Sequence, residues 1–122
     1  MASNKALKLA NGSWVGFMDH DDLLHKDALL YVAHNILSNP DVEIIYSDED
    51  KIDKNNKRYE PHFKSSWNYD LFLSQNYISH LTVIKHDLIK KIKGFSLCFD
   101  GSQDYGLLLK CLNYVKGEQI IH

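Results

Sequence analysis

Three aspartates in the turn at residues 19–22 are the side chains of this sequence best suited to chemistry. Asp19, Asp21 and Asp22 follow a short apolar run and are spaced so that two carboxylates can reach one hard cation. A cation such as Mg²⁺ or Mn²⁺ can in turn bridge the oxygens of a diphosphate. His20 lies within the turn, but hard cations favour carboxylates over imidazole, so we do not expect it to be a ligand.

Acidic turns also have simpler explanations. Asp21 or Asp22 can cap the helix expected after the turn, with the remaining carboxylates in solvent. A phosphatase with an aspartyl nucleophile requires a small residue and then a hydroxyl residue, where this chain has Asp22 and Leu23. An EF-hand loop requires a glycine at its sixth and a glutamate at its twelfth position, and neither follows Asp19 or Asp48. The helix cap therefore remains the main alternative to a metal site.

Alternating helical and strand patterns place the acidic turn at the end of a strand. Helical patterns occupy 3–11, 26–38, 69–73, 87–92 and 105–115, the last of them followed by residues 119–121, and β-prone apolar runs occupy 14–18, 42–46 and 81–84. The first run is typical of a strand buried on both faces. The aromatic and basic segment 59–67, interrupted by Pro61, is expected to be a loop or an edge segment. The alternation indicates an α/β layered sheet, in which ligands collect at the carboxyl ends of strands.

Composition excludes several classes of protein. The chain has 122 residues, enough for one domain, with 44% apolar and 25% charged side chains, as in ordinary globular proteins. Its net charge of −2 argues against a nucleic-acid binder. The two cysteines, Cys98 and Cys111, lack metal-ligand spacing, so we expect both to be small buried residues. Two such cysteines indicate a reduced, intracellular protein. No apolar run approaches the length of a membrane span, so we expect none in this segment.

A series of sequence segments runs in order along nearly the whole chain. The segments are 3–12 leading into 17–24, the strand and acids of 45–51, residues 74–80, Gly94-Phe95, and Gly101-Ser102-Gln103-Asp104-Tyr105. Together they resemble family 2 glycosyltransferases, and 45–51 is similar to the members that decorate bacterial polysaccharides. The resemblance implies a GT-A-like fold, the α/β layered sheet with flanking helices of nucleotide-diphospho-sugar transferases.

The resemblance also implies roles for individual residues. Asp19 and Asp21 would hold the metal ion and the diphosphate of the nucleotide sugar, with Asp22 as a further candidate at the same site. Asp104 matches the catalytic base that takes the proton from the acceptor hydroxyl, although it also suits the N-cap of the helix that follows. Contacts with the acceptor, or around the cation, are implied for Asp48, Asp50, His80 and Gln103.

Simpler roles stay open for several of these side chains. Asp48 and Asp50 can be solvated or paired with Lys51, and His80 can be a structural residue at the start of a strand. Three aromatic side chains can either stack on a sugar ring or pack in the core, namely Trp67, Tyr69 and Tyr77.

The function implied by the resemblance is inverting, metal-dependent transfer of a sugar from a nucleoside diphosphate sugar to a saccharide or lipid-linked acceptor in polysaccharide synthesis. Family members begin with strands that hold the nucleoside and continue to a further metal-ligand histidine, to which His122 is not assigned. Residues 1–122 are therefore expected to form a partial catalytic domain with weak or no activity alone. The alternative is a non-catalytic glycan- or protein-binding module. We expect a cytoplasmic location, at most peripheral to the inner face of the membrane, and self-association through an exposed sheet edge or apolar face.

Overall fold

The computed structural model describes residues 2–96 and 102–122. Its helices are α1 (Ala2–Leu9), α2 (Ala28–Ser38), α3 (Tyr69–Ser74), α4 (His86–Lys91), α5 (Gln103–Cys111) and the 3₁₀ turn η1 (Gly117–Gln119). Its strands are β1 (Trp14–Phe17), β2 (Ile44–Tyr46), β3 (Glu49–Ile52), β4 (Arg58–His62), β5 (Thr82–Lys85) and β6 (Ile120–Ile121). Cys98, which was predicted to be buried, lies outside the described residues. So does Gly101, the first residue of the last segment that resembles the family.

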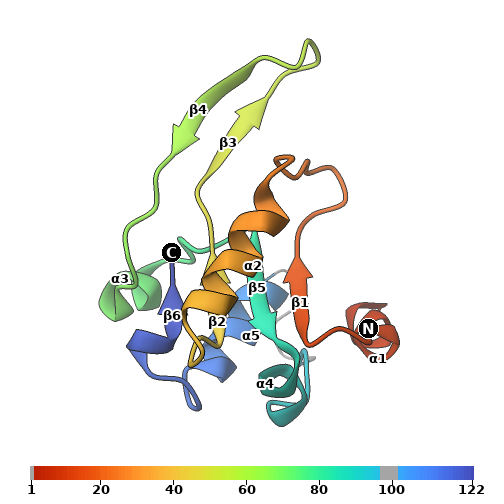
Figure 1. Ribbon diagram of the computed structural model, residues 1–122, viewed down its shortest axis with the longest axis vertical. Coiled ribbons are helices and arrows are strands. Elements are labelled where there is room, and N and C mark those ends of the chain that lie inside the picture. Colours follow the sequence, from red (N-terminus) through yellow and green to blue (C-terminus); the bar gives the residue numbers. More distant parts are fainter. Residues whose placement is uncertain (1, 97–101) are drawn as a thin grey trace.

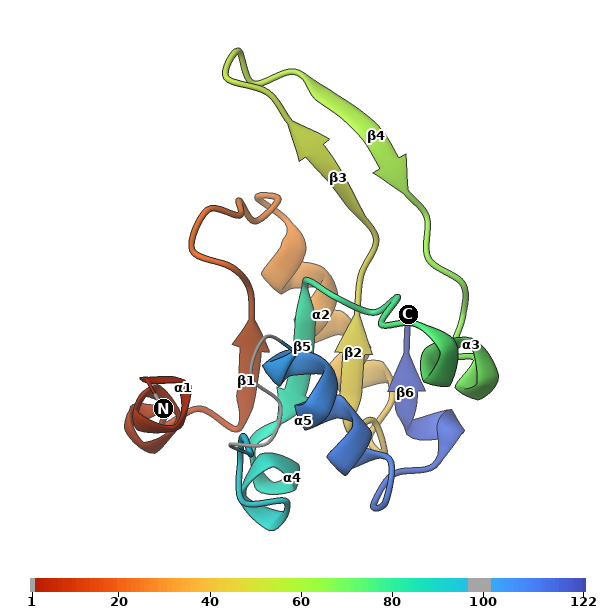
Figure 2. The same cartoon turned by 180° about the vertical axis from the view of Figure 1, so that it is seen from behind.

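The central sheet is mixed and has the strand order β1-β5-β2-β6 (Figures 1 and 2). β5 is antiparallel to both β1 and β2, whereas β2 and β6 are parallel. Consequently the C-terminal ends of β1, β2 and β6 lie at the end of the sheet at which β5 begins. The acidic turn follows β1 at this end of the sheet. His80, just before β5, and His122, just after β6, lie at the same end.

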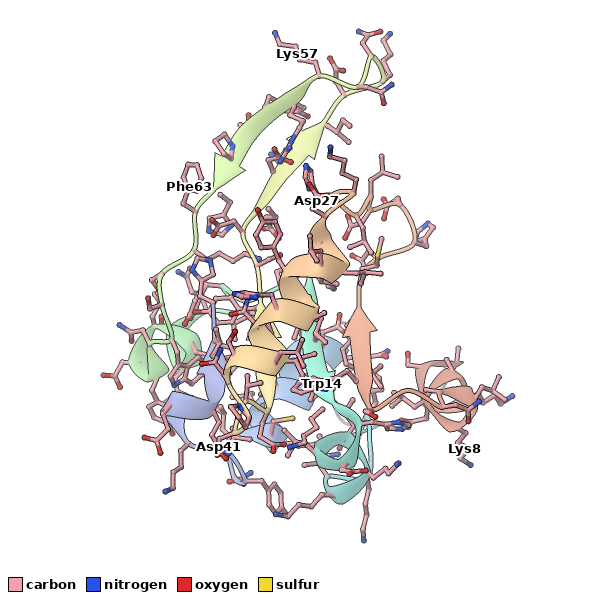
Figure 3. All side chains as sticks on the ribbon, viewed as in Figure 1. Lys8, Trp14, Asp27, Asp41, Lys57 and Phe63 are labelled. Carbon is pink, nitrogen blue, oxygen red and sulfur yellow. The ribbon has the colours of Figure 1, made fainter. Side chains whose placement is uncertain are left out.

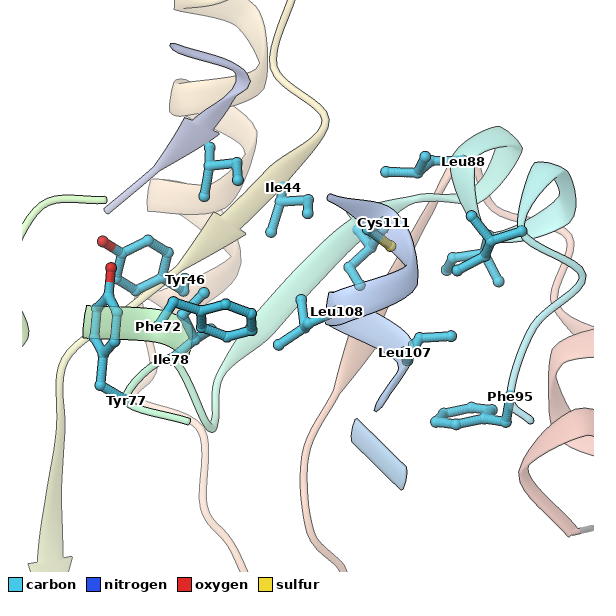
Figure 4. Close-up of a cluster of buried hydrophobic side chains, with 14 residues drawn as sticks. Ile44, Tyr46, Phe72, Tyr77, Ile78, Leu88, Phe95, Leu107, Leu108 and Cys111 are labelled. Atoms are coloured by element: carbon cyan, nitrogen blue, oxygen red, sulfur yellow. The ribbon is translucent and has the colours of Figure 1, made fainter. Parts of the chain in front are cut away.

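One face of the sheet packs on the larger hydrophobic core. Ile44, Tyr46 and Ile84 point into this core, where α3, α4 and α5 supply buried side chains such as Phe72 and Leu108 (Figure 4). Because successive strand residues point to opposite faces, their neighbours along the chain face the other way.

The second face of the sheet packs on α2, which crosses in front of the strands in Figure 1. Val42, Ile45 and Val83 form this smaller cluster, against which Val32 and Ile36 of α2 are packed. Helices therefore cover both faces of the sheet, and the predicted α/β layered sheet with flanking helices is confirmed.

A hairpin of β3 and β4 projects beyond the central sheet, with Lys57 at its tip and Phe63 at its base (Figure 3). An ion pair across the hairpin joins Asp50 to Arg58 at 2.5 Å. All residues of β4 are exposed, so the segment that begins at residue 59 is peripheral, as expected, and its first residues form an irregularly paired strand rather than a loop.

Two expectations about the N-terminal half are wrong. β1 is an edge strand with partly buried side chains, not a strand buried on both faces, because β5 is its only partner among the described strands. α2 begins at Ala28 with Asp27 in the N-cap position, so neither Asp21 nor Asp22 caps it.

α2 also leaves much of its apolar surface in solvent. Val32 and Ile36 pack on the sheet, but the exposed large side chains of this helix are Leu29, Leu30, Tyr31 and Leu37. In the part of the chain that the structure describes, no helix has both the length and the apolar character needed to cross a membrane.

Candidate active site

The imidazole ring of His80 lies at the centre of a cluster of carboxylates. Its Nδ1 atom is 3.7 Å from Oδ2 of Asp19 and 3.5 Å from Oδ2 of Asp22, and its Nε2 atom is 3.7 Å from Oδ2 of Asp104. Asp19 and Asp22 come from the turn after β1, His80 from the start of β5, and Asp104 from the first turn of α5. We call these four residues the His80 cluster.

The turn at 19–22 brings its first and last aspartates together. The N–H of Asp22 donates to the carbonyl of Asp19, and the N–H of Asp19 donates to Oδ2 of Asp22, both at 3.3 Å. Asp21 lies outside this arrangement, because its side chain is 77% exposed and approaches Nδ1 of His20, at 3.8 Å, rather than His80. The structure therefore groups Asp22, rather than Asp21, with Asp19.

Asp19, Asp22 and His80 offer a donor set that fits a divalent cation. One ligand atom from each residue lies within 4.8 Å of the others. Carboxylate oxygens suit Mg²⁺ and Mn²⁺, and an imidazole nitrogen is compatible with Mn²⁺. The ring of His80 is only 17% exposed, so its orientation is set by the surrounding protein.

Asp104 lies in the first helical turn of α5, after Ser102 in the N-cap position. The N-cap alternative for Asp104 is therefore wrong. The positive end of the helix dipole favours a negative charge in this turn, which suits an ionised carboxylate.

Two cavities meet at the start of α5. The larger, of ≈530 Å³, lies beside α1 and β1 and is lined by Asp19, His80, Gln103 and Asp104 among others. The smaller, of ≈370 Å³, is also lined by Gln103 and Asp104, together with Asn76 and other neighbours. Asp104 thus borders two recesses, and Gln103 accompanies it in both.

Comparison with known families decides what kind of protein carries this cluster. Residues 1–93, which include Asp19, Asp22 and His80, match the model of glycosyl transferase family 2. The chain belongs to this family. Gln103 and Asp104 lie beyond the matched residues, so the family match does not extend to them. The predicted family membership is confirmed.

Two curated relatives of this glycosyltransferase are much longer proteins. The chain is 46% identical over 121 residues to the uncharacterized protein y4gI of Sinorhizobium fredii, covering 99% of this chain and 13% of that protein. It is 34% identical over 109 residues to the O-antigen biosynthesis protein RfbC of Myxococcus xanthus, covering 89% of this chain and 8% of that protein.

The two acids after β2 do not join the His80 cluster. Asp50 lies in β3 and pairs with Arg58 of the hairpin, so the suggested pairing with Lys51 is wrong for Asp50. Asp48 accepts a hydrogen bond from the N–H of Lys64 at 2.7 Å and lies 2.7 Å from Nε2 of His122. Both residues therefore have partners within the protein.

The charge environment of Asp48 keeps it ionised. Partial burial would raise the pKa of Asp48, but the hydrogen bonds from Lys64 and His122, and their charges, outweigh burial and leave the pKa below its usual value. The ring of His122 also stacks on Tyr46, with 5.1 Å between the ring centroids. Asp48 and His122 thus form a second polar pair, at the ends of β2 and β6.

The three aromatic candidates for sugar stacking divide into two groups. Tyr77 is buried, and Trp67 packs against Phe72 with 5.3 Å between the ring centroids, so the packing alternative is right for both. Tyr69 is exposed at the start of α3.

Sequence reasoning did not single out Lys64, although its side chain is 0% exposed. The available signal was a lysine within an aromatic segment, after Phe63 and before Trp67, where a solvated lysine is the simplest reading. Its burial depends on contacts with two other segments, residues 48–49 and residues 78–80, which no local pattern shows.

Proposed function

We propose that this glycosyltransferase moves a sugar from a nucleoside diphosphate sugar to a saccharide or lipid-linked acceptor, with inversion at the anomeric carbon and with a divalent cation. The observation that carries the proposal is the position of Asp104, across the His80 ring from the Asp19–Asp22 pair. The relative with a role in O-antigen biosynthesis supports polysaccharide synthesis as the setting.

Asp19 and Asp22 would hold the cation, with His80 as the third donor from the protein. When bound, such a cation neutralises the negative charge that develops on a departing diphosphate. The carboxylates of Asp19 and Asp22 are accessible, and Asp19 borders the larger cavity, so the donor diphosphate has room on that side. Asp21 was predicted from the sequence as a ligand, so it competes with Asp22 as the second carboxylate that would hold the cation with Asp19.

Asp104 would act as the base. Its carboxylate accepts the proton of an acceptor hydroxyl while the hydroxyl oxygen forms a bond to the anomeric carbon, and the bond from that carbon to the diphosphate breaks with its electron pair. Inversion requires the acceptor and the leaving group on opposite sides of the sugar. The two recesses that Asp104 borders support such an arrangement, in which the donor would occupy the recess lined by Asp19 and the acceptor the recess lined by Asn76.

The experiment is an assay of the purified full chain with a panel of nucleoside diphosphate sugars and saccharide acceptors. Release of nucleoside diphosphate is measured with Mn²⁺, with Mg²⁺ and with EDTA, and the anomeric configuration of the product is read by NMR. Because residues 1–122 are expected to be a partial catalytic domain, we expect a weak, cation-dependent product of inverted configuration, lost in Asp19→Asn. Asp87→Asn is the matched control, because Asp87 is an exposed aspartate in the first turn of α4, at the other end of β5.

A product of retained configuration would reject the inverting mechanism. Full activity in EDTA would reject the cation. Binding of a glycan without any turnover, unchanged by Asp19→Asn, would support the alternative of a non-catalytic glycan-binding module.

A further inference from the structure

Lys64 is a buried lysine whose ammonium group is fully occupied. Its Nζ atom donates to the carbonyl oxygens of Ile78 at 2.5 Å and His80 at 2.8 Å, and to Oε2 of Glu49 at 3.1 Å. An ammonium group has three N–H donors, so each finds a partner. A buried charge without partners would destabilise the fold, and these contacts offset the loss of water.

The two carbonyls belong to a segment that the buried side chains of Tyr77 and Ile78 anchor in the larger core. Residues 75–81 join α3 to β5 without forming a helix or strand, and Ser79 within the segment has a positive φ of 45°. The ring of His80 projects from this segment toward Asp19, Asp22 and Asp104. The backbone that carries the ring is therefore held by Lys64, at the residue itself and two residues before it.

The third partner connects the same lysine to the hairpin. Glu49 is the first residue of β3, and Lys64 lies two residues after the end of β4. The main chain of Lys64 is fixed as well, because its N–H donates to Asp48. Burial lowers the pKa of Lys64, although the charge of Glu49 opposes this shift, and Glu49 itself has a lowered pKa because Lys64 and His62 outweigh its burial.

We propose that Lys64 is a positioning residue of the active site, which sets the His80 ring against Asp19, Asp22 and Asp104 by holding the carbonyls of Ile78 and His80. The effect of Lys64 on sugar transfer rests on the proposed function, whereas its effect on the His80 ring does not. Lys64 is not placed in contact with donor, acceptor or cation.

The test compares Lys64→Met with Lys85→Met. Lys85 is a matched control, because its Nζ atom also forms an ion pair with a glutamate, Glu43 at 2.8 Å, but at the opposite end of β5 from His80. Two readouts are needed: the NMR signals of the His80 ring in metal-free protein, and the dissociation constant for Mn²⁺ alone.

We expect the His80 ring signals to shift in Lys64→Met and to stay in place in Lys85→Met. The dissociation constant for Mn²⁺ should rise at least about tenfold in Lys64→Met, as for loss of a group that orients a metal ligand. In Glu49→Gln the ring signals should stay close to those of the unsubstituted protein, since both carbonyl contacts remain. If the His80 ring signals shifted as far in Glu49→Gln as in Lys64→Met, the effect could not be assigned to the carbonyl contacts.

A folded Lys64→Met variant with unchanged ring signals and unchanged Mn²⁺ affinity would overturn the proposal. Should that variant not fold, the unsubstituted protein provides the test. Its Lys64 ammonium protons should exchange slowly with solvent and show nuclear Overhauser effects to Ile78 and His80. If these protons exchanged as fast as those of the exposed Lys54, the proposal would be overturned. If the unsubstituted protein binds no Mn²⁺, the metal part of the proposed function fails, while the ring signals still decide the role of Lys64.

Discussion

Nε2 of His80 lies 3.7 Å from a carboxylate oxygen of Asp104, while Nδ1 of the same ring faces the turn after β1. One imidazole thus stands between the proposed cation-binding carboxylates and the proposed base. The relationship arises because β5 runs antiparallel to β1, so that His80, two residues before β5, meets the residues after β1. Substitutions on the two sides of this ring should have different consequences.

Asp104→Asn should abolish sugar transfer while leaving Mn²⁺ affinity close to that of the unsubstituted protein. An amide cannot accept the acceptor proton, and loss of a general base typically lowers the rate by about 10²–10⁴-fold. The rate of nucleoside diphosphate release with acceptor, measured beside Asp87→Asn, checks this. Retention of more than half of the activity would remove Asp104 from the mechanism.

Asp22→Asn should weaken Mn²⁺ binding more than Asp21→Asn does. Asp22 shares the turn's closing hydrogen bond and faces His80, whereas the side chain of Asp21 is directed to solvent. We expect a loss of at least about tenfold for Asp22→Asn, on the scale seen when metal sites lose a supporting group. Titration of Mn²⁺ followed by electron paramagnetic resonance measures both variants, and the reverse order would restore the spacing-based assignment to Asp21.

Acid should destabilise the protein partly through Asp48. The pKa of Asp48 is lowered in the folded chain, so its stabilising effect is present above the unfolded value of about 4 and is lost as the pH falls through the folded value. The free energy of unfolding, measured with urea between neutral pH and about pH 3, should therefore fall less steeply in Asp48→Asn. Asp87→Asn should keep the original slope, and an identical slope in all three proteins would contradict the expectation.

Self-association should depend on the exposed face of α2. Leu30 and Leu37 are large apolar side chains in solvent, 68% and 82% exposed, and apolar surface of this kind favours association. Light scattering at increasing concentration should show a rising average mass, and the double substitution Leu30→Lys with Leu37→Lys should suppress it. His34→Lys adds a charge at an exposed position of the same helix and should suppress it less. A constant monomer mass for the unsubstituted chain would exclude this surface as an interface.

Apolar periodicity was sufficient to predict the layered sheet. The runs at 14–18, 42–46 and 81–84 each became a strand of the central sheet, because each is short, apolar and bounded by polar residues. The hairpin could not be predicted in this way, since Glu49–Ile52 and Arg58–His62 are polar and gain their order from pairing with each other.

The site was predictable only in part. Family motifs brought Asp19, Asp22, His80 and Asp104 to attention, and the structure groups all four in one cluster. The choice between Asp21 and Asp22 depends on how the turn closes, which residue spacing does not determine. The burial of Lys64 depends on partners in β3 and in the segment before β5, which are far from it in sequence.

The hairpin also offers a place to modify the protein without disturbing the sheet. Its strands pair only with each other among the described strands, and its turn is closed locally by Asp53, which accepts hydrogen bonds from the N–H groups of Asn55 and Lys57. The residues between Asp53 and Lys57 are therefore a suitable position for a fluorescent label or a grafted peptide. Because Glu49 and Lys64 at the hairpin's base connect it to the His80 segment, the fluorescence of a label at the tip should change if substrate binding moves that segment.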